Sequence, residues 1–317
     1  MRGALMGRIL EVLRSTPVRA GFLLLALGLA IWAIAARWDE VVDALGRTAP
    51  WAVGAALVLS FIYVLLTMMA WRAVLADLGS RLAPSATASV FLVSQLGKYV
   101  PGGVWNIVAA AEVGSDHDVP RRRSVSAMAV AVLLSLVGGL LLALAVVPFA
   151  PSEIADRFGW AFVALPVVIA VLMPPVLNRL LGMLLRLTRR PPLETALTWR
   201  GVGEALAWTL ASWIAAGVQV WVLAVGVGMA PNVPTLLLCI GGYAMAWSVG
   251  FLVIFVPAGA GVREVILAVV LGGSLAAGEV LVVVILSRLV LTIADVALGL
   301  LGLVLGRRMR RRRSTGV

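Results

Sequence analysis

Two interruptions of apolar sequence carry the residue types best suited to hold an anion. They are residues 97–103 (GKYVPGG) and residues 256–264 (VPAGAGVRE), and each places a cation beside a break that contains Pro and Gly. Glycine lets a ligand approach the backbone, and helix starts concentrate unpaired N–H groups and positive dipole. The pattern predicts a site for an anion such as a phosphate. Its candidate residues are Lys98, Gly102, Gly103, Gly259, Gly261 and Arg263.

Two ionisable residues in the last apolar run are further candidates. Arg288 and Asp295 are seven residues apart, and Thr292 lies between them on the same helical face. A charged group inside a membrane segment costs about 2.5–3.5 kcal/mol to insert, so it normally faces a partner or a cavity. Two interpretations stay open. Either the two residues form an interior ion pair that holds helices together, or they line a polar route for a headgroup.

The remaining polar candidates each have two interpretations. Glu264 is adjacent to Arg263, so the two side chains diverge on a helix, and we expect Glu264 to cap the helix start or to pair elsewhere. Lys98 and Arg263 would lie at an interface if they merely snorkel. Polar residues able to line the same cavity, or to hydrogen-bond between helices, are Gln95, Asn106 and Gln219. The candidate proton carriers are Asp295 and Glu264.

Composition assigns the chain to the polytopic membrane proteins. Hydrophobic residues make up 62% of its 317 residues and charged residues 13%, against about a quarter in soluble domains. The chain is therefore expected to form a single integral membrane domain, residues 1–317. One cysteine, Cys239, excludes an intrachain disulfide, and one histidine, His117, leaves no His-based zinc site. No G-x-x-x-x-G-K-[ST] motif is present. We expect no cofactor, no metal and no enzyme activity.

The apolar runs define the expected architecture, an all-α bundle with six spans and two broken hairpins. The runs are residues 20–36, 50–71, 124–147, 158–178, 201–227 and 279–305. The breaks fall in residues 84–113 and 233–273. Both arms of the first region are too short to cross a membrane, which needs about 17–25 residues, so a re-entrant hairpin is favoured. The first arm of the second region is long enough to cross, so two crossings there also remain open.

Arginine placement predicts the topology. With the N-terminus inside, inner segments hold 20 of the 26 basic residues, including the basic lead 1–19 and the Arg-rich tail 306–317. This distribution accounts for the net charge of +11 without nucleic acid as a partner. The hairpins then enter from opposite sides and the spans after them run in opposite directions, as in an inverted repeat. Residues 1–36 also have features of a secretory signal, although the lead and apolar run are long for one.

Residues 97–105 (GKYVPGGVW), residues 256–264 and Arg288 in residues 286–289 (LSRL) carry a family resemblance. Over about residues 20–305 the chain resembles the flippase-like membrane domain of lysylphosphatidylglycerol synthases, in its stand-alone form. Ala258 departs from the more usual Pro-Gly-Gly. The resemblance implies lipid handling, either of an aminoacylated phospholipid or of a polyprenyl-phosphate-linked sugar. These 317 residues include no soluble aminoacyltransferase domain, so synthase activity is not expected of them.

The expected function is that of a flippase for an anionic lipid in the cytoplasmic membrane. Lys98 and Arg263 would attract phosphate, and Arg288 and Asp295 would shape the polar route. One alternative is an intramembrane lipid-phosphate transferase that uses Glu264 or Asp295 as acid or base. Another is a non-catalytic membrane partner of a glycosyltransferase, lipid synthase or other cell-envelope enzyme. The sequence leaves the oligomeric state open, and a homo-oligomer is compatible with it.

Overall fold

The computed structural model describes residues 35–99, 105–146, 159–187, 191–252 and 261–314, and every regular element within these ranges is a helix. Within these ranges five helices are long and apolar enough to cross a membrane: α4 (Pro50–Asp77), α7 (Arg121–Val146), α11 (Trp199–Gly226), α12 (Val233–Leu252) and α14 (Ala277–Ser314). The prediction of an all-α polytopic membrane fold is confirmed. The predicted span 20–36, the basic lead and the signal-like segment lie outside the described residues.

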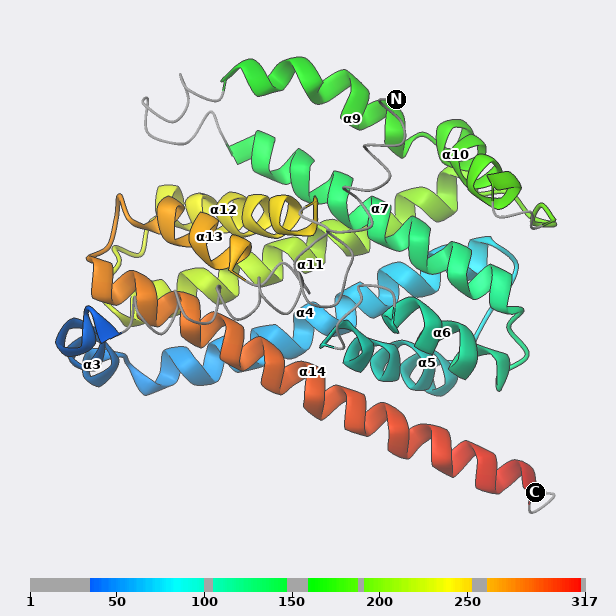
Figure 1. Cartoon of the computed structure of the whole chain (residues 1–317), viewed down its shortest axis with the longest axis horizontal. Helices are drawn as coiled ribbons and strands as arrows, with labels where there is room; N and C mark the ends of the chain where they lie inside the picture. Colours follow the sequence, from blue (N-terminus) through cyan, green and yellow to red (C-terminus); the bar gives the residue numbers. More distant parts are fainter. Residues whose placement is uncertain (1–34, 100–104, 147–158, 188–190, 253–260, 315–317) are drawn as a thin grey trace, which may run out of the picture.

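Helices α4 and α11 pack against each other in the middle of the bundle (Figure 1). Helix α4 begins with Pro50, which is well suited to the first turn of a helix because it has no N–H to satisfy. Helix α11 begins after Thr198, whose side-chain oxygen accepts a hydrogen bond from the amide of Gly201 at 3.1 Å. The pair forms the support on which both broken regions rest.

The first broken region is a pair of short helices. Helix α5 (Pro84–Leu96) leads into a 3-10 turn, η1 (Gly97–Tyr99), and α6 (Trp105–Ser115) returns along α5. The helices have 13 and 11 residues, so neither reaches the ~20 residues needed to cross. A Cβ atom at Gly97 would lie 2.7 Å from the backbone nitrogen of Asn106, so only glycine allows the two arms to approach this closely.

The second broken region pairs α12 with α13 (Val262–Leu271). Figure 1 shows α12 and α13 at the opposite end of the bundle from α5 and α6. The packing is reciprocal, because α5 packs on α14 whereas α12 packs on α7. With 20 residues, α12 is long enough to cross by itself, whereas the 10 residues of α13 are not. The sequence alone does not decide whether this region forms a hairpin or crosses the membrane twice.

The apolar run 158–178 differs from the continuous span that the sequence predicts. It contains a 3-10 segment, η3 (Gly159–Ala164), then α9 (Leu165–Leu172), and the chain bends by 72° before α10 (Pro174–Leu187). Met173 at the bend has an extended backbone, with φ −68° and ψ 128°. The cause is Pro174, because a proline disfavours helical geometry in the residue before it.

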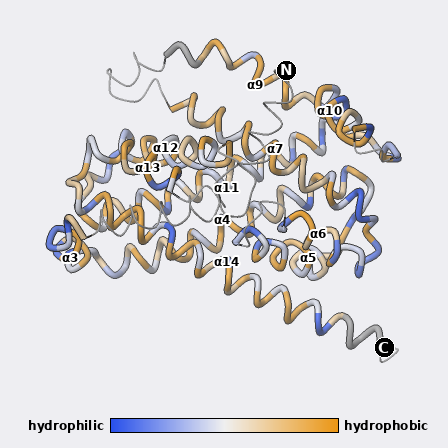
Figure 2. The backbone as a smooth tube through the Cα atoms, in the orientation of Figure 1, coloured by the Kyte–Doolittle hydropathy of each residue, from blue (hydrophilic) through white to orange (hydrophobic). Residues whose placement is uncertain are grey.

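The hydrophilic residues gather at the two ends of the bundle, and the tube between them is mainly hydrophobic (Figure 2). Helix α3 (Trp38–Arg47) lies at one end beside α14. At the other end of the bundle α4 and α10 finish and α7 and α11 begin (Figure 1). The Arg-rich segments of the sequence adjoin these helix ends. We refer to this end of the bundle as the Arg-rich end.

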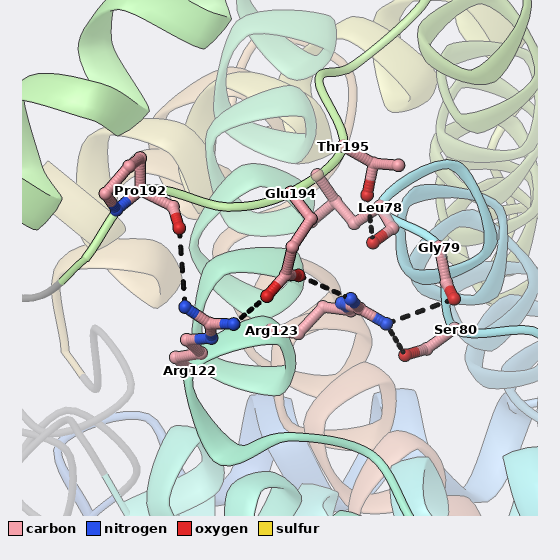
Figure 3. A network of polar contacts seen from close by, with 8 residues as sticks. All are labelled: Leu78, Gly79, Ser80, Arg122, Arg123, Pro192, Glu194 and Thr195. Carbon is pink, nitrogen blue, oxygen red and sulfur yellow. Dashed lines mark hydrogen bonds and ion pairs between the residues drawn. The ribbon is translucent and has the colours of Figure 1, made fainter.

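A polar network ties the α10–α11 connection to this Arg-rich end (Figure 3). Arg123 donates to the carbonyl oxygen of Gly79 at 3.1 Å, to the hydroxyl of Ser80 at 2.8 Å and to the carboxylate of Glu194 at 2.7 Å. Arg122 pairs with the same carboxylate. Three segments distant in sequence are therefore held together by two neighbouring arginines and one acid.

Replacing Arg123 with Ala should lower the free energy of unfolding by about 2–3 kcal/mol, because several charge-assisted hydrogen bonds are lost at once. The side chain of Arg123 is only 16% exposed. The matched control is Arg121→Ala, which breaks an exposed pair with Glu112 and should change stability little. Thermal unfolding of the purified variants in one detergent compares them. Equal losses in the two variants would show that the network does not anchor the connection.

Candidate functional site

A cavity of about 400 Å³ opens inside the bundle. Side chains from both broken regions and from all five long helices line it. Six of the site residues that the sequence predicts line this cavity: Gln95, Lys98, Asn106, Arg263, Arg288 and Asp295. Residues separated by nearly two hundred positions thus line the same cavity. The sequence predicts this, because a charged group inside a membrane segment normally faces a cavity or a partner.

Lys98 forms an ion pair with Asp295. The ammonium lies 2.7 Å from Oδ2 of Asp295, and the hydroxyl of Tyr99 donates to the same oxygen at 2.6 Å. Asp295 is fully buried, and the side chain of Lys98 is 28% exposed. Gln95 accepts a further, long hydrogen bond from Lys98 at 3.4 Å. Lys98 therefore points to an interior partner, and the snorkelling interpretation is wrong for this residue.

Arg288 pairs with Glu264 and not with Asp295. Its Nε lies 3.8 Å from Oε1 of Glu264, and the other carboxylate oxygen accepts a hydrogen bond from the amide of Gly261 at 2.6 Å. Glu264 thus caps the start of α13 and also forms a pair, which combines its two predicted roles. Gly261 has φ 88°, a left-handed conformation that favours glycine. The pair Lys98–Asp295 thus links the first break to α14, and the pair Glu264–Arg288 links the second break to α14.

Arg263 lies over the ring of Trp247, with 5.0 Å from its guanidinium carbon to the ring centroid. It forms no ion pair with any described residue, and its buried Nε has no hydrogen-bond partner. A Cβ atom at Gly250 would lie 2.5 Å from Cγ of Arg263, so this glycine makes room for the side chain. Arg263 is consequently the cavity cation with the most unused bonding capacity.

The structure places at the cavity three residues that the sequence did not predict there, and it places one predicted residue elsewhere. Tyr99 and the stacked pair Trp247 and Phe251, whose ring centroids are 5.2 Å apart, line the cavity. A signal was available, since Tyr99 adjoins Lys98 and the two aromatic residues flank Gly250 at helical spacing. Gln219 is buried away from the cavity, where it accepts a hydrogen bond from Ser287 at 3.1 Å and links α11 to α14. Gly102, Gly103 and Gly259 lie outside the described residues.

The cavity is amphipathic. The charged groups come from η1, α13 and α14. Helices α4, α5 and α7 contribute apolar side chains, Val64, Ala70, Phe91, Met128, Ala131 and Val132, together with the uncharged polar residues Tyr63, Thr67, Gln95 and Ser135. In the described ranges, no group of three or more His, Cys, Asp or Glu residues is arranged to hold a metal ion. The chemistry that this arrangement offers is electrostatic. It can hold a molecule with an anionic head and an apolar body.

No curated protein matches the chain. A comparison with protein families matches residues 4–299 to the Lysylphosphatidylglycerol synthase TM region. The match covers nearly the whole chain and agrees with the resemblance at the two breaks and at Arg288. The chain belongs to the Lysylphosphatidylglycerol synthase TM region family, and it is a multi-pass membrane protein of lipid or cell-envelope biosynthesis or translocation.

Proposed function

We propose that this protein is a flippase that carries an anionic lipid across the cytoplasmic membrane. The observation that carries the proposal is the meeting of Lys98, Arg263 and Arg288 at one cavity that also has apolar walls. Cations are expensive inside a membrane, and three of them at one cavity require a compensating ligand or partner. Two carboxylates pair with two of the cations, which leaves positive charge for the headgroup.

Arg263 is the first contact for the phosphate in this proposal. A guanidinium presents a planar fork of donors that suits the oxygens of a phosphate, and it is weakly hydrated compared with an ammonium. Trp247 fixes its plane through the cation–π contact. The apolar residues of α4, α5 and α7 then accompany the proximal part of the lipid chain, while the remainder stays in the bilayer.

The arrangement of helices supports a transport mechanism with two alternating states. The reciprocal packing of α5 on α14 and of α12 on α7 is what an inverted repeat would produce. In such proteins two opposed broken helices meet at a central site, and rocking of one repeat against the other exposes it to each side in turn. The substrate class in this proposal is an aminoacylated phospholipid or a polyprenyl-phosphate-linked sugar. The anionic group that the cations would hold is the phosphate in both, and the aminoacyl group of the first also carries an ammonium.

Reconstitution into vesicles tests the function directly. The probe is phosphatidylglycerol with a fluorescent label on its tail, and dithionite quenches the label only in the outer leaflet. We expect the protein to accelerate loss of the protected signal, and Arg263→Gln to slow it by about tenfold or more, equivalent to ~1.4 kcal/mol. Arg200→Gln at the exposed start of α11 is the control and should behave as wild type. Equal rates in protein-free and protein-containing vesicles would refute the flippase proposal.

A lipid-phosphate transferase is the second candidate, because carboxylates of Glu264 and Asp295 lie within the same cluster as the cations. Mass spectrometry of the vesicle lipids distinguishes the two functions. A lipid of changed mass that depends on the protein would favour the transferase. Intact cell-envelope function in cells that carry Lys98→Ala/Arg263→Ala would instead favour a non-catalytic partner of a glycosyltransferase or lipid synthase.

A further inference from the structure

The carboxylate of Asp295 has one saturated oxygen and one free oxygen. Oδ2 receives both Lys98 at 2.7 Å and Tyr99 at 2.6 Å, whereas Oδ1 is buried and has no hydrogen-bond partner among the described residues. Asp295 is fully buried and still lines the cavity. A buried carboxylate oxygen without a donor is unusual, because desolvation of a charged acceptor is costly. The free oxygen is therefore positioned to accept a proton or another donor.

The bound state of the proposed flippase creates a conflict at this pair. A phosphate that has contacted Arg263 in the cavity also attracts the ammonium of Lys98, which is the group that neutralises Asp295. Both anions cannot use the same ammonium fully in a medium of low dielectric constant. A buried carboxylate that loses its counter-cation normally becomes neutral rather than staying charged. Tyr99 continues to donate to Oδ2, so the new proton belongs on Oδ1.

The other ionisable groups near Asp295 do not replace Lys98. Helix α5, which packs on α14, contains no ionisable residue, and the charges of α3 lie near the start of α14, where Arg47 contacts Glu279. Within the described residues Lys98 is the cation in contact with this carboxylate. The other ionisable groups that line the cavity are Tyr63 on α4, Lys98 and Tyr99 on η1, Arg263 on α13 and Arg288 on α14. Tyr243 on α12 and Glu264 on α13 line a smaller pocket that shares Arg263 and Arg288 with the cavity.

We propose that Asp295 is a proton site coupled to anion binding. When a phosphate takes the ammonium of Lys98, one water-borne proton binds Oδ1 of Asp295, and release of the phosphate returns the proton as the ion pair re-forms. One phosphodiester charge and one proton thus enter the cavity together, so the binding step is electroneutral. This inference rests on the proposed function and adds to it a driving force, the transmembrane proton gradient.

Calorimetry on the full chain in detergent tests the coupling, with dihexanoylphosphatidylglycerol as the probe. Titrations near neutral pH in two buffers of different ionisation enthalpy give the number of protons bound with each probe molecule. We expect wild type to take up about one proton per bound probe. Asp295→Asn should take up none and bind about tenfold more tightly, because the internal competitor for Lys98 has lost its charge. Glu112→Gln, which changes an exposed pair with Arg121 outside the cavity, is the control, and it should retain the proton uptake.

The outcomes separate this inference from the function on which it rests. Probe binding by wild type without proton uptake overturns the proton site and leaves the flippase proposal intact. Uptake that persists in Asp295→Asn overturns it as well. No binding of the probe by wild type removes the headgroup site itself. Infrared difference spectra of the wild type need no variant: probe addition should replace a carboxylate band with a protonated carboxyl band, and an unchanged carboxylate band contradicts the proposal.

Discussion

Replacing Lys98 with Met should lower the free energy of unfolding by about 3–5 kcal/mol, the cost of leaving a buried charge without its partner. The carboxylate of Asp295 is fully buried, and its contacts are the ammonium of Lys98 and the hydroxyl of Tyr99. Methionine keeps the apolar length of the lysine side chain and removes only the charge and the donors. With only the phenol of Tyr99 as a partner, Asp295 in the folded variant either stays charged without a cation or takes up a proton, and both cost free energy relative to the unfolded state.

A double-mutant cycle isolates the pair in this experiment. Lys98→Met/Asp295→Asn removes both charges and should recover most of the stability lost in Lys98→Met, because no uncompensated charge remains buried. Unfolding by SDS in mixed micelles provides the measurement for wild type, both single variants and the double variant. Losses that simply add in the double variant would show that the two residues do not interact. Transport should stay impaired in the double variant, since the headgroup site has lost a cation.

The sequence was sufficient to predict which charged residues converge. Lys98, Arg263, Arg288 and Asp295 all interrupt apolar segments, and the cost of insertion drives such groups to a shared interior. Chain length and composition likewise determine the helical membrane fold, because a segment in lipid must satisfy its backbone hydrogen bonds internally. These inferences need no knowledge of how the helices are placed.

The sequence could not predict the partners of those charges. Arg288 and Asp295 share a helical face, but residues seven apart are separated by two turns, about 10 Å along the axis, so each needs a partner from another element. Those partners, Glu264 and Lys98, come from the two breaks. Which break reaches which turn of α14 depends on helix packing. The bend at Met173, by contrast, could have been predicted from the sequence, because Pro174 and Pro175 follow it. The prediction of a continuous span considered only the length and apolar composition of the run.

A second large effect is expected at Gly217, where α11 is in close contact with α12. A Cβ atom there would lie 2.3 Å from Cα of Ile240 and 2.7 Å from its Cγ1. The obstacle is backbone as well as side chain, so a rotamer change cannot relieve it. Gly217→Ala should therefore force α12 away from α11 and lower the free energy of unfolding by about 1–3 kcal/mol, the usual cost of overpacking.

The control for this prediction lies on the same helix and should change stability in the opposite direction. At Gly203 on α11 a Cβ atom would have no described neighbour within 4 Å, so Gly203→Ala meets open space. Alanine favours a helix over glycine by up to about 1 kcal/mol, and this variant should be neutral or slightly more stable than wild type. SDS-induced unfolding of the two variants provides the comparison. A gain of stability in both would mean that α11 and α12 are not in close contact at Gly217.

The Gly217 variant also tests how the site depends on its support. Helix α12 carries Trp247, whose ring orients Arg263, and Gly250, which makes room for that side chain. Displacing α12 should move both residues away from the position that holds the guanidinium. Transport of the labelled lipid by Gly217→Ala should consequently fall even where the variant remains folded, whereas Gly203→Ala should keep the wild-type rate. A folded Gly217→Ala protein with unchanged transport would separate α12 packing from the headgroup site and leave Arg263 positioned by α13 alone.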